Sequence, residues 1–99
     1  MIPDHTRHIG ILSVSLYMPA AQSLKDRRMI LKSLKDKLRA NFNISIAQLD
    51  QEDKWQTAIC GIVMIGNDQR YLNSTLSNVL AFIESYRDLE ISDTEISFI

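Results

Sequence analysis

The first apolar segment of the chain, residues 8–18, alternates between apolar and small polar side chains. Leucine or valine occupies every second position from 12 to 16, and Ser13, Ser15 and Tyr17 occupy the positions between and after them. A period of two over this length predicts a β-strand with one strongly apolar face. Pro19 then ends the strand, because proline has no N–H to donate to a neighbouring strand.

Two later segments carry apolar residues at the three- and four-residue spacing of an amphipathic helix. The first covers residues 24–39 and follows Ser23, a favoured N-cap, with Asp26 near the positive end of the helix. The second follows a Gly-Asn-Asp turn, where Asn67 or Asp68 would be the cap. The residues expected to face the core are Leu24, Ile30, Leu31, Leu34 and Leu38 in the first helix and Leu72, Leu76, Val79, Leu80 and Ile83 in the second.

Three more strands complete the pattern. Residues 43–49 alternate between isoleucine and small residues, and residues 89–99 alternate weakly. Residues 55–65 are apolar on both faces, which is typical of a central strand or of a strand covered by a partner. The charged connection at 50–54 is too short for a crossover helix, so it should join antiparallel neighbours.

The element order β-α-β-β-α-β predicts a ferredoxin-like α+β fold, in which a four-stranded antiparallel sheet has two helices on one face. Residues 8–99 would form this single domain, and residues 1–7 a flexible tail. The other face of the sheet would carry small and apolar side chains, and such a surface is seldom left exposed, so we expect a homodimer. The residues expected on that face, besides part of the strand 55–65, are Ser13, Ser15, Tyr17, Ser45 and Ala47.

The segment between the first strand and the first helix carries a family resemblance. Residues 19–28, PAAQSLKDRR, resemble the signature of the YlxP-like family of small uncharacterised bacterial proteins. The run at 39–43, the spacing from Asp50 to Trp55 and the turn at 66–68 are also similar, so the likeness covers about residues 9–98. The resemblance implies a ferredoxin-like fold, commonly dimeric, and a link to translation or ribosome maturation, with no settled biochemical activity.

The composition limits the classes of protein to consider. Apolar residues make up 45% and charged residues 23% of the 99 residues, as in ordinary globular domains. No apolar run approaches the ~18–20 residues that span a bilayer, and the first residues lack the apolar stretch of a secretory signal. The single cysteine, Cys60, excludes an internal disulfide and a cysteine-based zinc site, and it is expected to be a small buried residue. We expect a cytoplasmic protein.

Basic residues are concentrated in the first predicted helix. This helix holds seven of the eleven basic residues of the chain and two acidic residues, so its net charge is +5. The formal net charge of the whole chain is −1. At about 100° per residue, five of them fall within an arc of about 80° beside the apolar stripe, along about 20 Å. Such a row suits contact with several phosphates, so RNA or a ribosomal subunit is the expected partner, with a solvated helix face as the alternative. The five are Lys25, Arg28, Lys32, Lys35 and Arg39.

Three other residues are candidates for the dimer interface or for structural packing. Arg27 projects into the apolar stripe, where it would either extend its guanidinium to solvent or pair with a carboxylate of a second copy. Trp55 is expected in the core or in the dimer contact rather than as a platform for a ligand. Tyr17 ends the first strand, and because the aromatic pattern of RNA-recognition sheets is missing, the helix and not the sheet is expected to contact RNA.

No arrangement of side chains predicts catalysis, a cofactor or a metal. Asp50, Glu52 and Asp53 could ligate a hard cation, but three acids on a short connection are usually only solvated. His5 and His8 lack a third ligand. The sequence therefore predicts a non-catalytic binding protein.

Two alternatives belong to other functional classes. One is a small-molecule sensing or regulatory dimer, with a pocket at the sheet face or at the dimer seam. The other is a hydrolase, since acylphosphatases share this fold and use an arginine-bearing loop with an asparagine nearby. Arg27 or Arg28 would be that arginine and Asn43 would be that asparagine. Residues 19–22 replace the glycine-rich loop of that family, which counts against this alternative.

Overall fold

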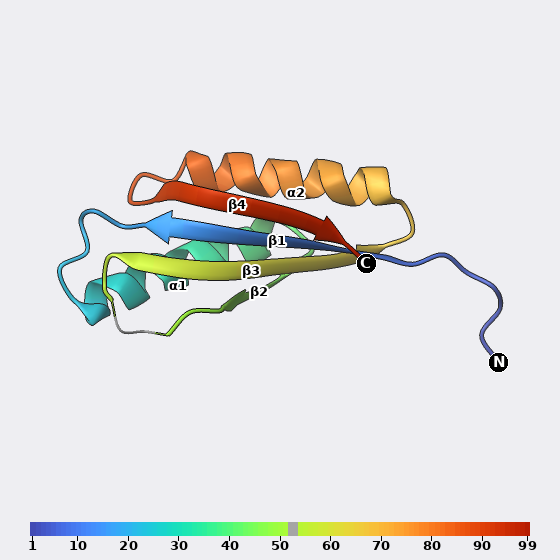
Figure 1. The fold of residues 1–99 in the computed structure, drawn as a ribbon, viewed down its shortest axis with the longest axis horizontal. Coiled ribbons are helices and arrows are strands. Elements are labelled where there is room, and N and C mark those ends of the chain that lie inside the picture. Colours follow the sequence, from blue (N-terminus) through green and yellow to red (C-terminus); the bar gives the residue numbers. More distant parts are fainter. Residues whose placement is uncertain (52–53) are drawn as a thin grey trace.

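A computed structural model describes residues 1–51 and 54–99 of the chain. Six elements follow one another in the predicted β-α-β-β-α-β order (Figure 1). They are β1 (His8–Tyr17), α1 (Leu24–Asn41), β2 (Ser45–Gln48), β3 (Thr57–Gly66), α2 (Gln69–Glu84) and β4 (Glu90–Phe98). Residues 1–7 hold no helix or strand and extend away from these elements (Figure 1). Within the described residues, no helix is both long enough and apolar enough to cross a membrane.

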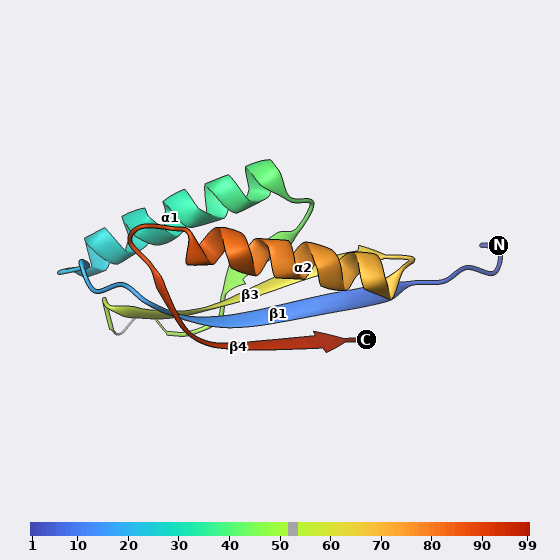
Figure 2. The same cartoon turned by 90° about the horizontal axis from the view of Figure 1, so that it is seen from above.

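The four strands form one antiparallel sheet in the order β2-β3-β1-β4. Both helices pack on the same face of this sheet, and neither covers the other face (Figure 2). The interior position of β3 agrees with its two-sided apolar pattern. β1 pairs with β3 over ten residues, from His8 opposite Gly66 to Tyr17 opposite Thr57. The ferredoxin-like α+β fold expected from the sequence is confirmed.

Side-chain caps determine where the two helices begin. The Ser23 hydroxyl accepts a hydrogen bond from the Asp26 N–H at 3.0 Å, and the Asp26 carboxylate accepts one from the Gln22 N–H at 3.0 Å. This exchange satisfies two backbone donors at the start of α1. At the start of α2, Asp68 is the cap, and its carboxylate accepts from the Arg70 N–H at 2.9 Å.

The hydrophobic core lies between the sheet and the two helices. Alternate residues of β1 and β3 form the side of the core that belongs to the sheet, and the apolar stripes of both helices form the other side. Leu24, Ile30 and Leu80, all predicted to face the core, lie at its margin and are half-buried. The helical residues with at most 2% of their surface exposed are Arg27, Leu31, Leu34 and Leu38 in α1 and Leu72, Leu76, Val79 and Ile83 in α2.

The face of the sheet that the helices leave uncovered carries a cluster of branched apolar side chains. Ile65 of β3 is paired with Ile9 of β1, and Ile9 exchanges two backbone hydrogen bonds, of 3.0 and 2.8 Å, with Ile99. Paired residues of adjacent strands point to the same face, so these three isoleucines form a row across the sheet. Ile11 and Val63 form the neighbouring pair. We call these residues the isoleucine–valine patch: Ile9, Ile11, Val63, Ile65 and Ile99.

Two glycines give a matched test of packing on the two faces. A Cβ on Gly10 would lie 2.9 Å from Cδ1 of Leu76, which is fully buried, whereas a Cβ on Gly61 would lie 2.7 Å from Cδ1 of Leu49, which is exposed and can turn away. We expect Gly10→Ala to lower the free energy of unfolding by about 1–3 kcal/mol. Gly61→Ala should leave it unchanged or raise it by up to about 1 kcal/mol. Urea denaturation measures both, and equal effects would contradict this account of the two faces.

Candidate functional site

The five cations predicted to form a row lie along one flank of α1, and four of them are exposed, with Lys35 half-buried. This flank faces the β2 edge of the sheet, since the Arg39 guanidinium donates to the Ile46 carbonyl oxygen at 3.4 Å. The opposite flank faces α2, where Nζ of Lys37 lies 5.1 Å from the ring centroid of Tyr86. The row is therefore separate from the contact between the helices. We call it the cation row: Lys25, Arg28, Lys32, Lys35 and Arg39.

Within the cation row, Lys32 has a carboxylate partner one helical turn away. Its Nζ lies 2.7 Å from Oδ2 of Asp36. The hydrogen bond and charge of Lys32 lower the pKa of the Asp36 carboxyl, so Asp36 is ionised at neutral pH. The two side chains are 78% and 55% exposed, and an ion pair this exposed adds little stability. Lys32 can therefore exchange Asp36 for another anion at small cost.

Acidic residues gather at the opposite edge of the sheet. β4 forms that edge, and β2, beside the cation row, forms the other (Figure 1). Five carboxylates lie at the end of α2, on β4 and in the segment between them, and all five are exposed. We call this group the acidic edge: Glu84, Asp88, Glu90, Asp93 and Glu95. These two groups of opposite charge thus lie at opposite edges of the sheet, with Asp26 and Asp36 also on α1 and Arg87 beside Asp88.

Arg27 is a fully buried charged residue at the junction of α1 with the sheet. Its Nε donates to the Thr57 carbonyl oxygen at 3.1 Å, and its Nη2 donates to Oδ2 of Asp50 at 2.7 Å. Gln48, with its amide oxygen turned toward the guanidinium, accepts from Nη1 at 2.8 Å and from Nη2 at 3.1 Å. The second oxygen of Asp50 accepts from the Ile59 N–H at 2.9 Å. This arginine network joins α1 to the end of β2 and the start of β3.

The expectation that Arg27 extends to solvent or reaches a carboxylate of a second copy is wrong. The carboxylate is Asp50 of the same chain, and its side chain is only 18% exposed, so Asp50 is not simply solvated either. Glu52 and Asp53, the other two acids considered for a cation site, lie outside the described residues. Among the residues that the structure does describe, no three His, Cys, Asp or Glu side chains are grouped to hold a metal ion.

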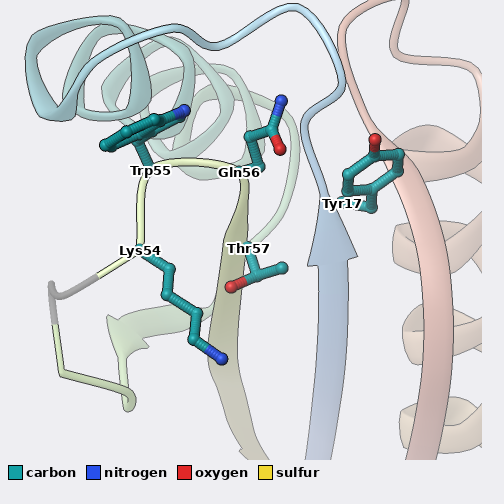
Figure 3. Close-up of a pocket in the computed structure, with 5 residues that line it drawn as sticks. All are labelled: Tyr17, Lys54, Trp55, Gln56 and Thr57. Carbon is teal, nitrogen blue, oxygen red and sulfur yellow. The ribbon is translucent and has the colours of Figure 1, made fainter.

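Trp55 does not belong to the core, because 48% of its surface is exposed. It lies in the connection just before β3. Together with Tyr17, Lys54, Gln56 and Thr57 it lines a hollow of about 300 Å³, which we call the tryptophan hollow (Figure 3). The Trp55 and Tyr17 rings lie on the two sides of Gln56 (Figure 3). Of the two places expected for Trp55, the core is therefore excluded, and the contact with a second copy stays a prediction.

Two arrangements bear on the alternative functions. Asn43 follows the C-terminal cap of α1, whereas Arg27 and Arg28 lie in its first turns, about 20 Å away along the helix axis. These residues therefore cannot act on one substrate as an acylphosphatase-like site requires. Among the described residues, those that line a hollow of about 210 Å³ on the open sheet face include Asp93 and Glu95 and no basic side chain, which disfavours an anionic ligand there.

Cys60 lies on the core side of β3 and is 1% exposed, so the prediction of a small buried residue is confirmed. Burial raises the pKa of its thiol to about 11. The thiol therefore stays protonated at neutral pH, and a protonated thiol is a poor nucleophile.

The arginine network predicts a large and coupled effect on stability. Arg27→Met and Asp50→Ala should each lower the free energy of unfolding by about 3–5 kcal/mol, because each leaves polar groups buried without a partner. The double variant should lose clearly less free energy of unfolding than the two single variants lose together. The second change removes a polar group that the first change has already left without its partner. Urea denaturation of the four proteins measures this coupling.

A matched control is the exposed pair of the cation row. Lys32→Met and Asp36→Ala remove the same kinds of group from an ion pair of the same 2.7 Å length. Because that pair is exposed and screened by solvent, each change should lower the free energy of unfolding far less than the changes at the buried pair. Similar losses at the buried and exposed pairs would contradict a structural role for the arginine network.

Comparisons with known proteins agree with the fold. Over residues 9–96 the chain matches the family model described as "Protein of unknown function (DUF503)". It is 32% identical over 82 residues to "Uncharacterized protein YlxP" of Bacillus subtilis (strain 168), covering 83% of this chain and 89% of that protein. It also resembles the structure of "De novo designed protein Foldit4" with a TM-score of 0.53 at 8% identity, over 93% of this chain and 96% of that one, a likeness of fold alone. The family match and the curated relative together make the chain a member of the DUF503 family, as its YlxP-like motifs predicted.

Proposed function

We propose that this protein binds RNA through the cation row of α1 and performs no chemistry on it. The observation that carries the proposal is the gathering of five cations on one accessible flank, on a chain whose formal net charge is −1. From Lys25 to Arg39 the row extends about 21 Å, which corresponds to about six steps of one nucleic-acid strand. Several cations can therefore meet several phosphates of one backbone.

The placement of the first cations supports a role in binding. Lys25 and Arg28 lie near the N-terminal end of α1, where the aligned peptide dipoles already present partial positive charge. The helix dipole favours carboxylates at that end, so it does not favour these two cations there. A phosphate at the same place would be attracted by both the side chains and the dipole.

RNA is the polyanion that the available support favours. The YlxP-like motifs of the chain imply a link to translation, and RNA within a ribosomal subunit is the target that this link suggests. Contacts to phosphates carry no sequence information by themselves, so binding through the cation row alone would be tolerant of sequence.

Charge reversal in the cation row tests the proposal. Five phosphate contacts to a single strand give a slope of about −3.5 for the logarithm of the binding constant against the logarithm of salt concentration. Lys32→Glu with Lys35→Glu should weaken binding of a single-stranded RNA and flatten this slope by at least about 1.4. Fluorescence anisotropy of labelled RNA between about 50 and 200 mM salt measures both quantities.

The matched control reverses Lys37, on the flank of α1 that faces α2, and Arg87, in the segment after α2. Lys37 and Arg87 are both exposed and line one hollow there, so Lys37→Glu with Arg87→Glu changes the net charge by the same amount. This variant should keep most of the affinity and the slope. Equal losses in both double variants, or no binding by the natural chain at low salt, would contradict the proposal.

We further propose that a second copy of the chain covers the open sheet face. Three strands of nine or ten residues and the four-residue β2, about 4.8 Å apart, present a flat face of about 500 Å² before the relief of the side chains is counted, against the ~800 Å² per partner of a standard interface. A two-fold arrangement brings the isoleucine–valine patch against itself, and this patch contains no charge. Asp93 and Glu95 lie opposite Ser15 and Ser13 of β1, farther along the sheet from the patch.

Sedimentation equilibrium tests the dimer. Val63→Lys with Ile65→Lys places two desolvated charges in the proposed contact and should convert the protein to a monomer at micromolar concentration. The control, Met29→Lys with Tyr71→Lys, adds the same charge at exposed apolar positions of the two helices and should leave the dimer intact. A natural chain that is monomeric at these concentrations would refute the proposal.

A further inference from the structure

The tryptophan hollow is an exposed aromatic site at one end of the sheet. Tryptophan and tyrosine usually cover most of their apolar surface in a folded protein, yet 48% of Trp55 and 37% of Tyr17 is exposed. Both rings and Lys54 line the hollow, and the Lys54 side chain extends away from the Trp55 ring (Figure 3). Aromatic surface next to a cation suits a ligand that has a flat π-system and a negative charge.

Hydrogen bonds to backbone carbonyl oxygens hold the residues around this hollow in place. The Met18 N–H donates to the Gln56 carbonyl oxygen at 2.7 Å, and the Gln56 amide donates to the Pro19 carbonyl oxygen at 3.3 Å. On the core side, Nε of Arg27 donates to the Thr57 carbonyl oxygen. The segment that carries Trp55 is thus tied to the end of β1 and to α1. A ligand loses less free energy to ordering when the site is already held in shape.

The hollow lies close to the N-terminal end of α1, where the cation row begins. Arg27 lies between Lys25 and Arg28 in the sequence, and its contact with Thr57 sets the first turns of α1 against the strand that lines the hollow. Lys25 and Arg28 are the first two cations of the row. A strand whose phosphates follow the row would therefore reach the hollow at the N-terminal end of α1.

We infer that the tryptophan hollow receives an unpaired base of the RNA whose backbone lies along the cation row. This inference rests on the proposed function and adds a second kind of contact to it. The base stacks on the Trp55 indole, with Tyr17 on the far side of Gln56 and Lys54 near the phosphate. Stacking of this kind tolerates any base, so the preference is for single-stranded over duplex RNA rather than for a sequence.

The test uses the fact that Trp55 is the single tryptophan of the chain. The full chain is titrated with a single-stranded oligoribonucleotide of about 12 nucleotides, within the site sizes of single-strand binding domains, and with an abasic oligomer of equal length. The base-bearing oligomer should quench the indole emission, and the abasic one should not. Trp55→Ala should lower the affinity for the base-bearing oligomer by about 5- to 150-fold and leave the affinity for the abasic oligomer unchanged.

Two variants separate stacking from a general loss of the fold. Trp55→Phe keeps an aromatic face and should restore most of the affinity, whereas Tyr71→Ala removes another exposed aromatic side chain, from α2, and should change nothing. Circular dichroism confirms that each variant is folded.

The outcomes also separate this inference from the proposed function. If Trp55→Ala binds both oligomers as the natural chain does, with the same salt slope, the hollow takes no base while the cation row still binds RNA. If neither oligomer binds at low salt, the proposed function fails and the inference fails with it. If the indole emission changes with protein concentration but not with RNA, a second copy covers Trp55 and the inference is overturned.

Discussion

The contact between the Arg27 guanidinium and the Asp50 carboxylate, 2.7 Å apart, brings three segments of the chain to one place. Removing a guanidinium from water is costly, and the cost is offset only where several acceptors meet its donors in good geometry. Here the acceptors are Asp50, the Gln48 amide oxygen and the Thr57 carbonyl oxygen. They lie on the two sides of the connection between β2 and β3. The path of that connection and the start of β3 therefore depend on one side chain of α1.

The same interaction divides the basic residues of α1 into two kinds. Arg27 has a planar group with donors in fixed directions, which lets it serve three acceptors at once, whereas a lysine would offer a point charge. Its charge is used inside the domain. The cations of the row lie on the neighbouring flank, outside the leucine stripe, and one of them, Arg39, also donates to the Ile46 carbonyl oxygen of β2. One helix can thus anchor the fold and present positive charge to a partner.

The sequence predicted most of the fold because the information needed was local. The alternation in β1, the stripes of both helices and the Ser23 cap each depend on residues within a few positions of one another. The role of Arg27 could not be predicted in this way, since its partner lies 23 residues away. An arginine inside an apolar stripe was the available signal, but it did not indicate which acid would meet it. For Trp55 the sequence left two places open, the core and a contact with a second copy, and only its position before β3, which leaves half of it exposed, excludes the core.

The cation row and the acidic edge give the domain an uneven distribution of charge that its net charge conceals. With a formal charge of −1, a uniform sphere of this size would be weakly repelled by any polyanion. The cation row and the acidic edge lie instead at opposite sides of the domain, beside β2 and on β4. The electric field of a polyanion would orient such a molecule before contact, so that α1 faces the polyanion and β4 faces away from it. Orientation during approach would then be governed by ionic strength, independently of how tightly the final complex holds.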